Sequence, residues 1–309
     1  MEIIRRISQL FGFIISHSYL KFLDTKQVYQ GPFKANCVPF FSCHACPAAV
    51  FSCPIGTLQH YAVIRMAPWA ELGSLGLILI AVGRMVCGWL CPFGLLQDLL
   101  YKIKSIKVKI PKWTHNFRYF IFIFMVLLIP YLHGELTFCH FCPVGTLEAA
   151  IPWVVWDPIS REYGLPVIDP TTIGFQFCMK IFIFVVLIVF MVISKRPFCR
   201  VLCPLSVILS VFNRFSLVRM TVEKRHLCRK SCTLCLNGCP MELKVSDDPN
   251  SGECIRCLKC TKCKKVKIGI GYLKDPVIQY AMKTAGNIAS ESPDKSMPPG
   301  APSPQDRED

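Results

Sequence analysis

Two short stretches place pairs of cysteines at the ends of long apolar runs. GRMVCGWLCPFG covers residues 83–94, and RPFCRVLCPLS covers residues 196–206. In each stretch the two thiols stand four residues apart and a proline follows the second. Because thiolates are the soft, anionic ligands that iron–sulfur clusters and zinc prefer, the repeat predicts one four-thiolate site at the inner edge of a membrane. Its expected ligands are Cys87, Cys91, Cys199 and Cys203.

The residues around these pairs suit a ligand site. Pro92 and Pro204 are typical of the first turn of a helix, where a missing N–H has no cost, and the positive end of such a helix favours the thiolate form. Arg84, Arg196 and Arg200 would offset the negative charge of the thiolates. The alternative is a set of inert thiols at crowded helix ends, since free cysteine is often simply buried.

A related pair of motifs lies in the loops between the apolar runs. These motifs are CHAC at residues 43–46 and CHFC at residues 139–142. By analogy with the inner pairs they predict a second four-thiolate site, on the outer side. Its expected ligands are Cys43, Cys46, Cys139 and Cys142. Disulfides in an oxidising compartment are the alternative for these loop thiols.

The two halves of the chain repeat each other. SCPIGTLQ at residues 52–59 matches FCPVGTLE at residues 141–148, and an inner Cys-x3-Cys-Pro motif follows later in each half. The order of motifs is the same in both halves, which predicts a parallel duplication of a helix pair. This alignment pairs Cys53 with Cys142, so Cys53 competes with Cys46 for the outer site, and the sequence leaves both alignments open.

Eight further cysteines form two runs, CRKSCTLCLNGCP at residues 228–240 and CIRCLKCTKC at residues 254–263. Bacterial ferredoxins use two C-x2-C-x2-C-x3-C-P runs, in which the fourth cysteine of each run ligates the other cluster. The runs therefore predict two 4Fe-4S clusters, although the altered gaps leave the cross-ligation open and a zinc ribbon pair is the alternative. The expected ligands are Cys228, Cys232, Cys235, Cys239, Cys254, Cys257, Cys260 and Cys263.

Composition and hydropathy predict a membrane protein. Apolar residues make up 52% of the 309 residues, and the mean hydropathy is +0.42. We expect an all-α membrane protein with four transmembrane helices, arranged as a duplicated helix pair, and a small C-terminal ferredoxin-like α+β iron–sulfur domain. The expected spans are residues 4–23, 62–83, 117–133 and 173–194. An amphipathic helix on the membrane surface is the alternative for the first of them.

The distribution of charge sets the expected orientation and domains. The net charge of +15 comes mainly from Lys and Arg at the ends of apolar runs, which indicates membrane topology and argues against a nucleic-acid partner. The positive-inside rule places both termini in the cytoplasm of a multi-pass protein of the bacterial cytoplasmic (inner) membrane. We expect a membrane domain at 1–215, a ferredoxin-type domain at 216–275 and a disordered tail at 276–309.

The motifs CGWLCP and CRVLCP, together with the two C-terminal cysteine runs, resemble the NapH/MauN-type polytopic membrane ferredoxins, to which NosR and CcoG are more distantly similar. The resemblance implies electron transfer between the quinone/quinol pool and redox partner proteins, as a quinol dehydrogenase-like subunit. It implies membrane ligands at Cys87, Cys91, Cys199 and Cys203 and two 4Fe-4S clusters on the eight C-terminal cysteines, and the outer motifs leave room for further membrane clusters.

Two other functions are compatible with the sequence. One is a CcoG-like copper reductase or assembly factor, and the other is a membrane-anchored regulator whose cysteines bind zinc. Among the histidines, His44 and His140 stand beside outer cysteines, while His60 and Glu148 fall just after the outer motifs as candidates for proton handling.

Overall fold

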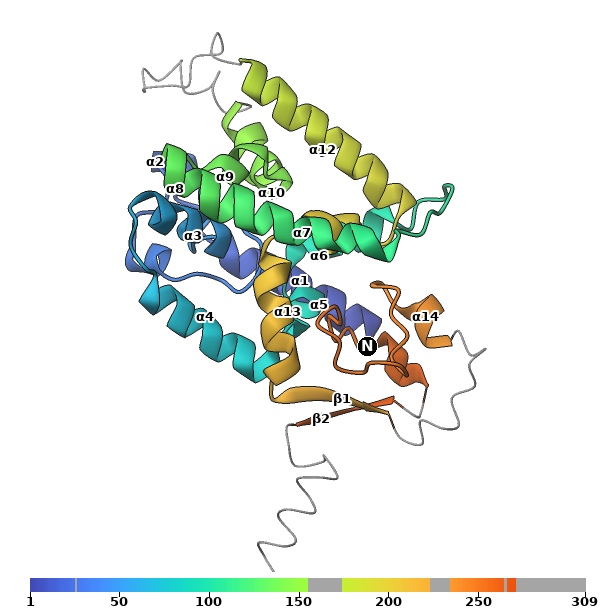
Figure 1. Ribbon diagram of the computed structural model, residues 1–309. Coiled ribbons are helices and arrows are strands. Elements are labelled where there is room, and N and C mark those ends of the chain that lie inside the picture. Colours follow the sequence, from blue (N-terminus) through green and yellow to red (C-terminus); the bar gives the residue numbers. More distant parts are fainter. Residues whose placement is uncertain (26, 155–173, 223–233, 264–265, 271–309) are drawn as a thin grey trace, which may run out of the picture. The chain divides into compact units, whose positions relative to one another are not determined.

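The structure is a computed structural model that describes residues 1–270 apart from 26, 155–173, 223–233 and 264–265 (Figure 1). All of these residues except Ile270 belong to one compact unit, Met1–Gly269. Most of the described residues outside loops are helical. Two short strands, β1 (Val218–Val222) and β2 (Val266–Ile270), pair with each other. The expected, mainly helical architecture is confirmed, whereas the separate domain boundaries remain predictions and the expected tail lies outside the described residues.

The helices follow one another with short connections. The first half contains α1 (Glu2–Ser16), α2 (Phe22–Thr25), η1 (Pro32–Ala35), α3 (Pro54–Val63), α4 (Trp69–Val82), α5 (Met85–Trp89), α6 (Pro92–Leu100) and η2 (Lys112–Asn116). The second half contains α7 (Phe117–Phe120), η3 (Ile121–Leu128), α8 (Ile129–His133), α9 (Thr137–Phe141), α10 (Pro143–Gly145), η4 (Thr146–Ala150), α12 (Phe175–Ile193), η6 (Phe198–Leu202), α13 (Leu205–Phe215), α14 (Leu234–Gly238) and η8 (Lys259–Lys262).

Two stretches in the described part of the chain are long and apolar enough to cross a bilayer, Trp113–His133 and Phe175–Ile193. They correspond to the third and fourth expected spans. The helices at the first and second positions, α1 and α4, have 15 and 14 residues. At 1.5 Å per residue such helices reach about 22 Å, short of the hydrocarbon core of about 30 Å. Four complete spans therefore remain a prediction.

The ends of α4 explain why the second expected span is short. Pro68 precedes the first residue of the helix, and a proline there removes the backbone donor that a longer helix would need. Gly83 ends the helix with a φ of 57°, a backbone conformation that favours glycine. An added Cβ at Gly83 would also lie 2.7 Å from the side-chain oxygen of Asn213.

The stretch from α7 through η3 to α8 runs as one helix, drawn in green in Figure 1. Its middle third, η3, winds as a wider π-helix. Pro130 follows at the start of α8 and cannot donate to the preceding turn, a situation in which helices commonly rewind locally.

Helix α1 has an inverted distribution of polar and apolar residues. Its buried face consists of Arg5, Gln9, Gly12 and Ser16, while Ile3, Ile7, Leu10, Phe11 and Ile14 are exposed. A helix in water buries its apolar face, so this distribution suits contact with lipid on the outer face. Gly12 allows the close approach that the polar face needs, because an added Cβ would lie 2.5 Å from the carbonyl oxygen of Leu90.

The core connects the two halves of the duplication. Helix α1 packs on α6, α4 on α13, and α3 on α8. At the centre, the ring of Phe198 meets Phe93 and Phe41 edge to face, with ring centroids 5.0 Å and 5.5 Å apart. Such T-shaped contacts fix ring positions, and these three rings lie between the cysteine sites described next.

Candidate functional site

Four cysteines from the two halves of the chain line one inner cavity. Cys87 lies in α5 and Cys91 caps α6, while Cys199 lies in η6 and Cys203 directly precedes the first turn of α13. The cavity has a volume of about 10 Å³ and is also lined by Arg84 and the three central phenylalanines. The structure thus brings together the four thiols expected from the inner repeat. A group inserted between them has to turn the side chains outward, because the volume is only that of one water molecule.

The helix starts explain the Cys-Pro motifs. The sulfur of the second cysteine accepts a hydrogen bond from the backbone N–H three residues later, as seen for Cys91 with Gly94 and for Cys203 with Ser206. The outer motifs repeat this contact, Cys53 with Gly56 and Cys142 with Gly145. Proline leaves the first turn intact, and the free N–H groups of that turn point at the sulfur.

Burial and crowding act on the inner thiols together. Burial raises the pKa of Cys91 to about 12, and the neighbouring thiols of Cys199 and Cys87 raise it further against the backbone donors. Thiols crowded in this way repel one another once they ionise, so they favour a bound cationic group that neutralises them. This behaviour fits a metal or iron–sulfur ligand set.

Arginine side chains hold the backbone of this site in place. Arg196 donates from Nη1 to the carbonyl oxygen of Cys87 at 3.2 Å, and Arg84 donates from Nη2 to that of Cys199 at 3.3 Å. Both arginines are buried, so their charges act on the site at short range with little solvent screening. The third expected arginine, Arg200, instead bonds Glu242 through Nη1 at 2.7 Å.

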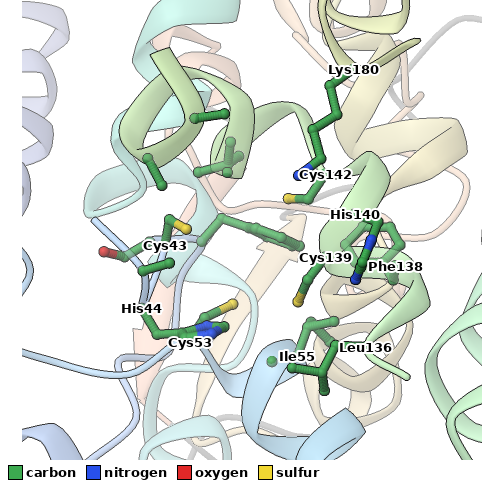
Figure 2. Close-up of a pocket in the computed structure, with 18 of the residues that line it drawn as sticks. Cys43, His44, Cys53, Ile55, Leu136, Phe138, Cys139, His140, Cys142 and Lys180 are labelled. Atoms are coloured by element: carbon green, nitrogen blue, oxygen red, sulfur yellow. The ribbon is translucent and has the colours of Figure 1, made fainter. Parts of the chain in front are cut away.

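A second set of four cysteines lines an outer cavity of about 370 Å³. Figure 2 shows the four sulfur atoms directed into the same space, with the Lys180 amine beside Cys142. Burial raises the pKa of Cys43 and of Cys53 to about 12. The four cysteines are Cys43, Cys53, Cys139 and Cys142.

The position of Cys46 differs from the expectation for the outer site. Cys46 lines another cavity, while Cys53 stands at the fourth position of the outer set. The physical reason lies in the following residues, because Cys53-Pro54 starts helix α3, whereas Cys46-Pro47 is followed by a turn. Of the two competing alignments, the structure follows the one that pairs Cys53 with Cys142.

Three further side chains reach the outer cavity. His44 and His140, the histidines beside the outer cysteines, both line it. Lys180 comes from the apolar helix α12 and also lines it, which accounts for a lysine inside a lipid-facing segment. The sequence gave Lys180 a possible interior position but no partner.

Glycines make room beside the outer thiols. An added Cβ at Gly145 would lie 3.6 Å from the sulfur of Cys43, and one at Gly56 would lie 3.7 Å from that of Cys139. Each of these glycines follows a helix-starting cysteine by three residues and faces the first cysteine of the opposing pair. A side chain at either position would narrow the space between the four sulfurs.

The donor chemistry and the space at the outer site fit a multi-atom cluster. Within the described ranges, no three His, Cys, Asp or Glu side chains stand at the spacing of ligands to a single metal ion. The four outer thiols instead surround a volume, with glycine cradles and helix-start N–H groups around it. Cysteine thiolates with N–H donors are the usual ligand environment of iron–sulfur clusters.

Six of the eight C-terminal cysteines lie in the described part of the chain, and they fall into two neighbourhoods. Cys228 and Cys232 lie outside the described residues. Cys239 shares an apolar cluster with Cys257 and interacts electrostatically with Cys254. The second neighbourhood contains Cys235, Cys260 and Cys263. The contact of Cys239 with the second run matches the ferredoxin exchange of the fourth ligand.

The inner site and the C-terminal cysteines adjoin each other. Cys87 packs against the apolar cluster that contains Cys239 and Cys257. Gly88 permits the contact, because an added Cβ there would lie 2.5 Å from the carbonyl oxygen of Ile255. Trp89 fixes the same segment by donating from Nε1 to the carbonyl oxygen of Arg256 at 3.0 Å.

A third, apolar cavity of about 840 Å³ lies beside both cysteine sites. Pro92 and Phe93 of the inner motif and Leu147 of the outer repeat line it. Its polar end carries the paired side chains of His17 and Glu148, with His17 Nε2 3.4 Å from Glu148 Oε2. Sequence reasoning singled out Glu148 and missed His17. His60 of the same hypothesis does not line any of these three cavities.

Comparison with known proteins points to iron–sulfur chemistry. A family model described as a 4Fe-4S binding domain matches residues 72–111, 116–156 and 179–223. Each matched segment contains one cysteine pair of the inner or outer motifs. The pairs are Cys87 with Cys91, Cys139 with Cys142, and Cys199 with Cys203.

Several curated proteins are similar over half of the chain or more. An uncharacterized protein of Methanocaldococcus jannaschii is 31% identical over 60% of this chain and 71% of its own length. The methylamine utilization ferredoxin-type protein MauN of Methylobacillus flagellatus is 24% identical over 51% of this chain and 48% of its own length. The regulatory protein NosR of Stutzerimonas stutzeri is 28% identical over 56% of this chain and 22% of its own length. No solved structure matches the chain.

Proposed function

Because the chain belongs to the MauN- and NosR-related family of 4Fe-4S ferredoxin-type proteins, we propose that it is a membrane-bound iron–sulfur protein that conducts electrons. The electrons pass between the quinol pool, or an extracytoplasmic redox partner, and 4Fe-4S clusters of the C-terminal cysteine runs. The observation that supports this most is the contact of Cys87 with the C-terminal cluster of Cys239 and Cys257. Two ligand sets in direct contact are close enough for electrons to move between them.

The cysteines would act as ligands at three places in sequence. A bound 4Fe-4S cluster supplies the one-electron chemistry. The inner thiols would hold one group and the C-terminal thiols two, while the outer thiols would hold a further one. Phe41 lines both the outer and the inner cavity, so a single ring separates the two membrane sets. The protein's own part is to fix these spacings and to supply N–H donors and cationic side chains.

The apolar cavity supports a quinol as the membrane-soluble donor or acceptor. Its lining is almost entirely carbon, and its volume of about 840 Å³ suits a substituted ring with part of an isoprenoid tail. The pair of His17 and Glu148 offers hydrogen-bond partners for a ring hydroxyl at the polar end. Oxidation of a quinol releases two electrons and two protons, so its site needs polar groups beside an electron acceptor. The inner motif supplies that neighbour through Phe93.

The membrane topology belongs to the same proposal. Four helix positions with both termini in the cytoplasm agree with the positive-inside rule, and the exposed apolar face of α1 supports contact with lipid. The inner thiols, the buried arginines and the C-terminal runs then lie on the cytoplasmic side. The outer thiols lie on the opposite side, where an extracytoplasmic partner could meet them.

The decisive test compares cluster content with electron transfer. Iron and acid-labile sulfide are measured in anaerobically purified protein, where about eight irons indicate two clusters and about twelve or more add a membrane cluster. In the double variant Cys91→Ala, Cys203→Ala, reduction of the C-terminal clusters by a quinol should be lost, while their direct reduction by dithionite persists. Unchanged quinol-linked reduction in this variant would contradict the conduit.

A regulator with zinc in its cysteine sites is the second candidate, because the NosR relatives are called regulatory proteins. The same measurement separates the two. Zinc with negligible sulfide would favour the regulator, whereas iron with stoichiometric sulfide favours electron transfer. A copper reductase predicts in addition that a deletion strain is sensitive to copper.

A further inference from the structure

The residue six positions after each helix-starting cysteine is buried and points at the opposing half of its site. Four Cys-Pro motifs start the helices that carry the inner and outer ligands. The residues at the sixth position are Gln59, Gln97, Glu148 and Leu209. All four are buried or nearly so, although two of them carry an amide that an apolar core does not need.

At the inner site, Gln97 reaches across to a ligand of the other half. Its Nε2 donates to the sulfur of Cys199 at 3.1 Å, and the side chain is fully buried. The orientation of the amide is fixed, because the same nitrogen lies 3.4 Å from the carbonyl oxygen of Phe93, which can only accept. The N–H is therefore presented to the sulfur.

The outer site repeats this arrangement with Gln59. Its Nε2 lies 3.2 Å from the sulfur of Cys139, and its Oε1 accepts the backbone N–H of Phe138 at 2.9 Å. In the other outer motif, Glu148 accepts the backbone N–H of Cys43 at 2.7 Å, so it contacts the first cysteine of the opposing pair without donating to its sulfur. Leu209 has no donor.

We propose that Gln59 and Gln97 are positioning residues that donate an amide hydrogen bond to a ligand sulfur of each membrane cluster and raise the reduction potential of that cluster. Reduction adds negative charge that spreads onto the ligand sulfurs, and an N–H donor stabilises this charge more in the reduced state than in the oxidised state. The two halves of each site are unequal, because only one half carries the glutamine. This inference rests on the proposed function, since it needs clusters at the membrane cysteines.

Potentiometric titration of the membrane clusters, followed by electron paramagnetic resonance, tests the role of Gln97. The variant Gln97→Met keeps the volume but removes the donor, so the core stays filled. We expect the equilibrium constant for reduction to fall about tenfold, which is about 59 mV for a one-electron couple. Gln59→Met should shift the outer cluster by a similar factor and leave the inner cluster unchanged.

Gln9 provides the matched control. It is also a fully buried glutamine at the inner site, but its Nε2 donates to the carbonyl oxygen of Cys91 at 3.2 Å and not to a sulfur. Gln9→Met should leave both potentials unchanged, even if the protein becomes less stable. Equal potentials in wild type and Gln97→Met, or an equal shift in Gln9→Met, would overturn the inference while leaving the conduit intact. If the wild type contains only the C-terminal clusters, the proposed membrane clusters fail first, and the inference fails with them.

Discussion

Arg196 binds Asp98 through two parallel hydrogen bonds, from Nε to Oδ1 at 2.8 Å and from Nη2 to Oδ2 at 2.7 Å. Arg5 adds a third bond to Oδ2 at 2.8 Å, and all three side chains are largely buried. This carboxylate ties the N-terminal helix to both inner cysteine pairs, since Arg196 also holds the carbonyl oxygen of Cys87. One buried anion thus fixes two cations that the candidate site uses.

The variant Asp98→Asn should destabilise the protein strongly. It leaves two buried guanidinium groups without their counter-charge, and breaking a buried pair in this way costs about 3–5 kcal/mol. Thermal unfolding in detergent micelles measures the loss. The control is Glu2→Gln, which breaks the exposed pair with Arg6 and should cost less than about 0.5 kcal/mol. Similar losses in both variants would contradict the structural role of Asp98.

The same carboxylate predicts how stability depends on acid pH. Burial alone would raise the pKa of Asp98, but the guanidinium groups of Arg196 and Arg5 outweigh it and lower the pKa to about 2. Since the folded-state pKa lies below the unfolded value of about 3.9, the stabilisation is complete above pH 4 and is lost as the pH falls toward 2. The expected loss is on the order of 2 kcal/mol. In Asp98→Asn, unfolding measured across this range should show a shallower dependence on pH, and a slope equal to that of the wild type would argue against the assignment.

Gly88→Ala should loosen the C-terminal cysteine segment from the inner site. The new methyl group would lie 2.5 Å from the carbonyl oxygen of Ile255, which cannot yield without backbone movement. Overpacking of this kind costs about 1–3 kcal/mol. Hydrogen exchange of the amides in residues 251–257 should rise. Gly76→Ala is the matched control, because nothing lies within 4 Å of the added Cβ, and faster exchange in both variants would remove the specific contact from the argument.

The inner set could be predicted from the sequence because both copies share the same spacing and each second cysteine starts a helix. The outer set could not, since its first half lacks a close cysteine pair and the spacing from Cys43 to Cys53 is set by a loop fold. The feature that distinguishes Cys53 from Cys46 is the helix that follows it, and that depends on tertiary packing against α8. The relation to MauN and NosR, which rests on the repeated motifs, is confirmed.

The membrane spans show the limit of hydropathy. Residues 62–83 have the composition of a span, yet Pro68 and Gly83 set the ends of a shorter helix. In α1, hydropathy identifies the apolar face but not the polar face, whose Arg5 and Gln9 reach partners more than eighty residues away. Such partners are visible only when the fold brings the segments together.

Iron content should respond differently to the two competing outer cysteines. Cys53→Ser removes a sulfur from the outer cavity and should lower iron by about four atoms per chain, on four irons per cubane cluster. Cys46→Ser leaves all four outer sulfurs in place and should retain the wild-type iron content. Iron determination on both proteins, purified without air, checks this. Loss of iron in Cys46→Ser alone would restore the alignment that uses Cys46.

Filling the apolar cavity should block quinol without affecting the cysteine sites. Leu96 lines the cavity beside the inner motif, and Leu96→Trp places a bulky ring where a quinol headgroup would bind. The rate of cluster reduction by a soluble quinol should fall about tenfold, which corresponds to about 1.4 kcal/mol of lost binding. Reduction by dithionite should be unchanged, because it needs no apolar site. His17→Ala should slow the quinol reaction in the same way by removing a hydrogen-bond partner at the polar end, while Leu10→Ala, at the lipid-facing rim, should have little effect. If all three variants react with quinol at the wild-type rate, electrons enter elsewhere, and the outer cavity becomes the entry point to test.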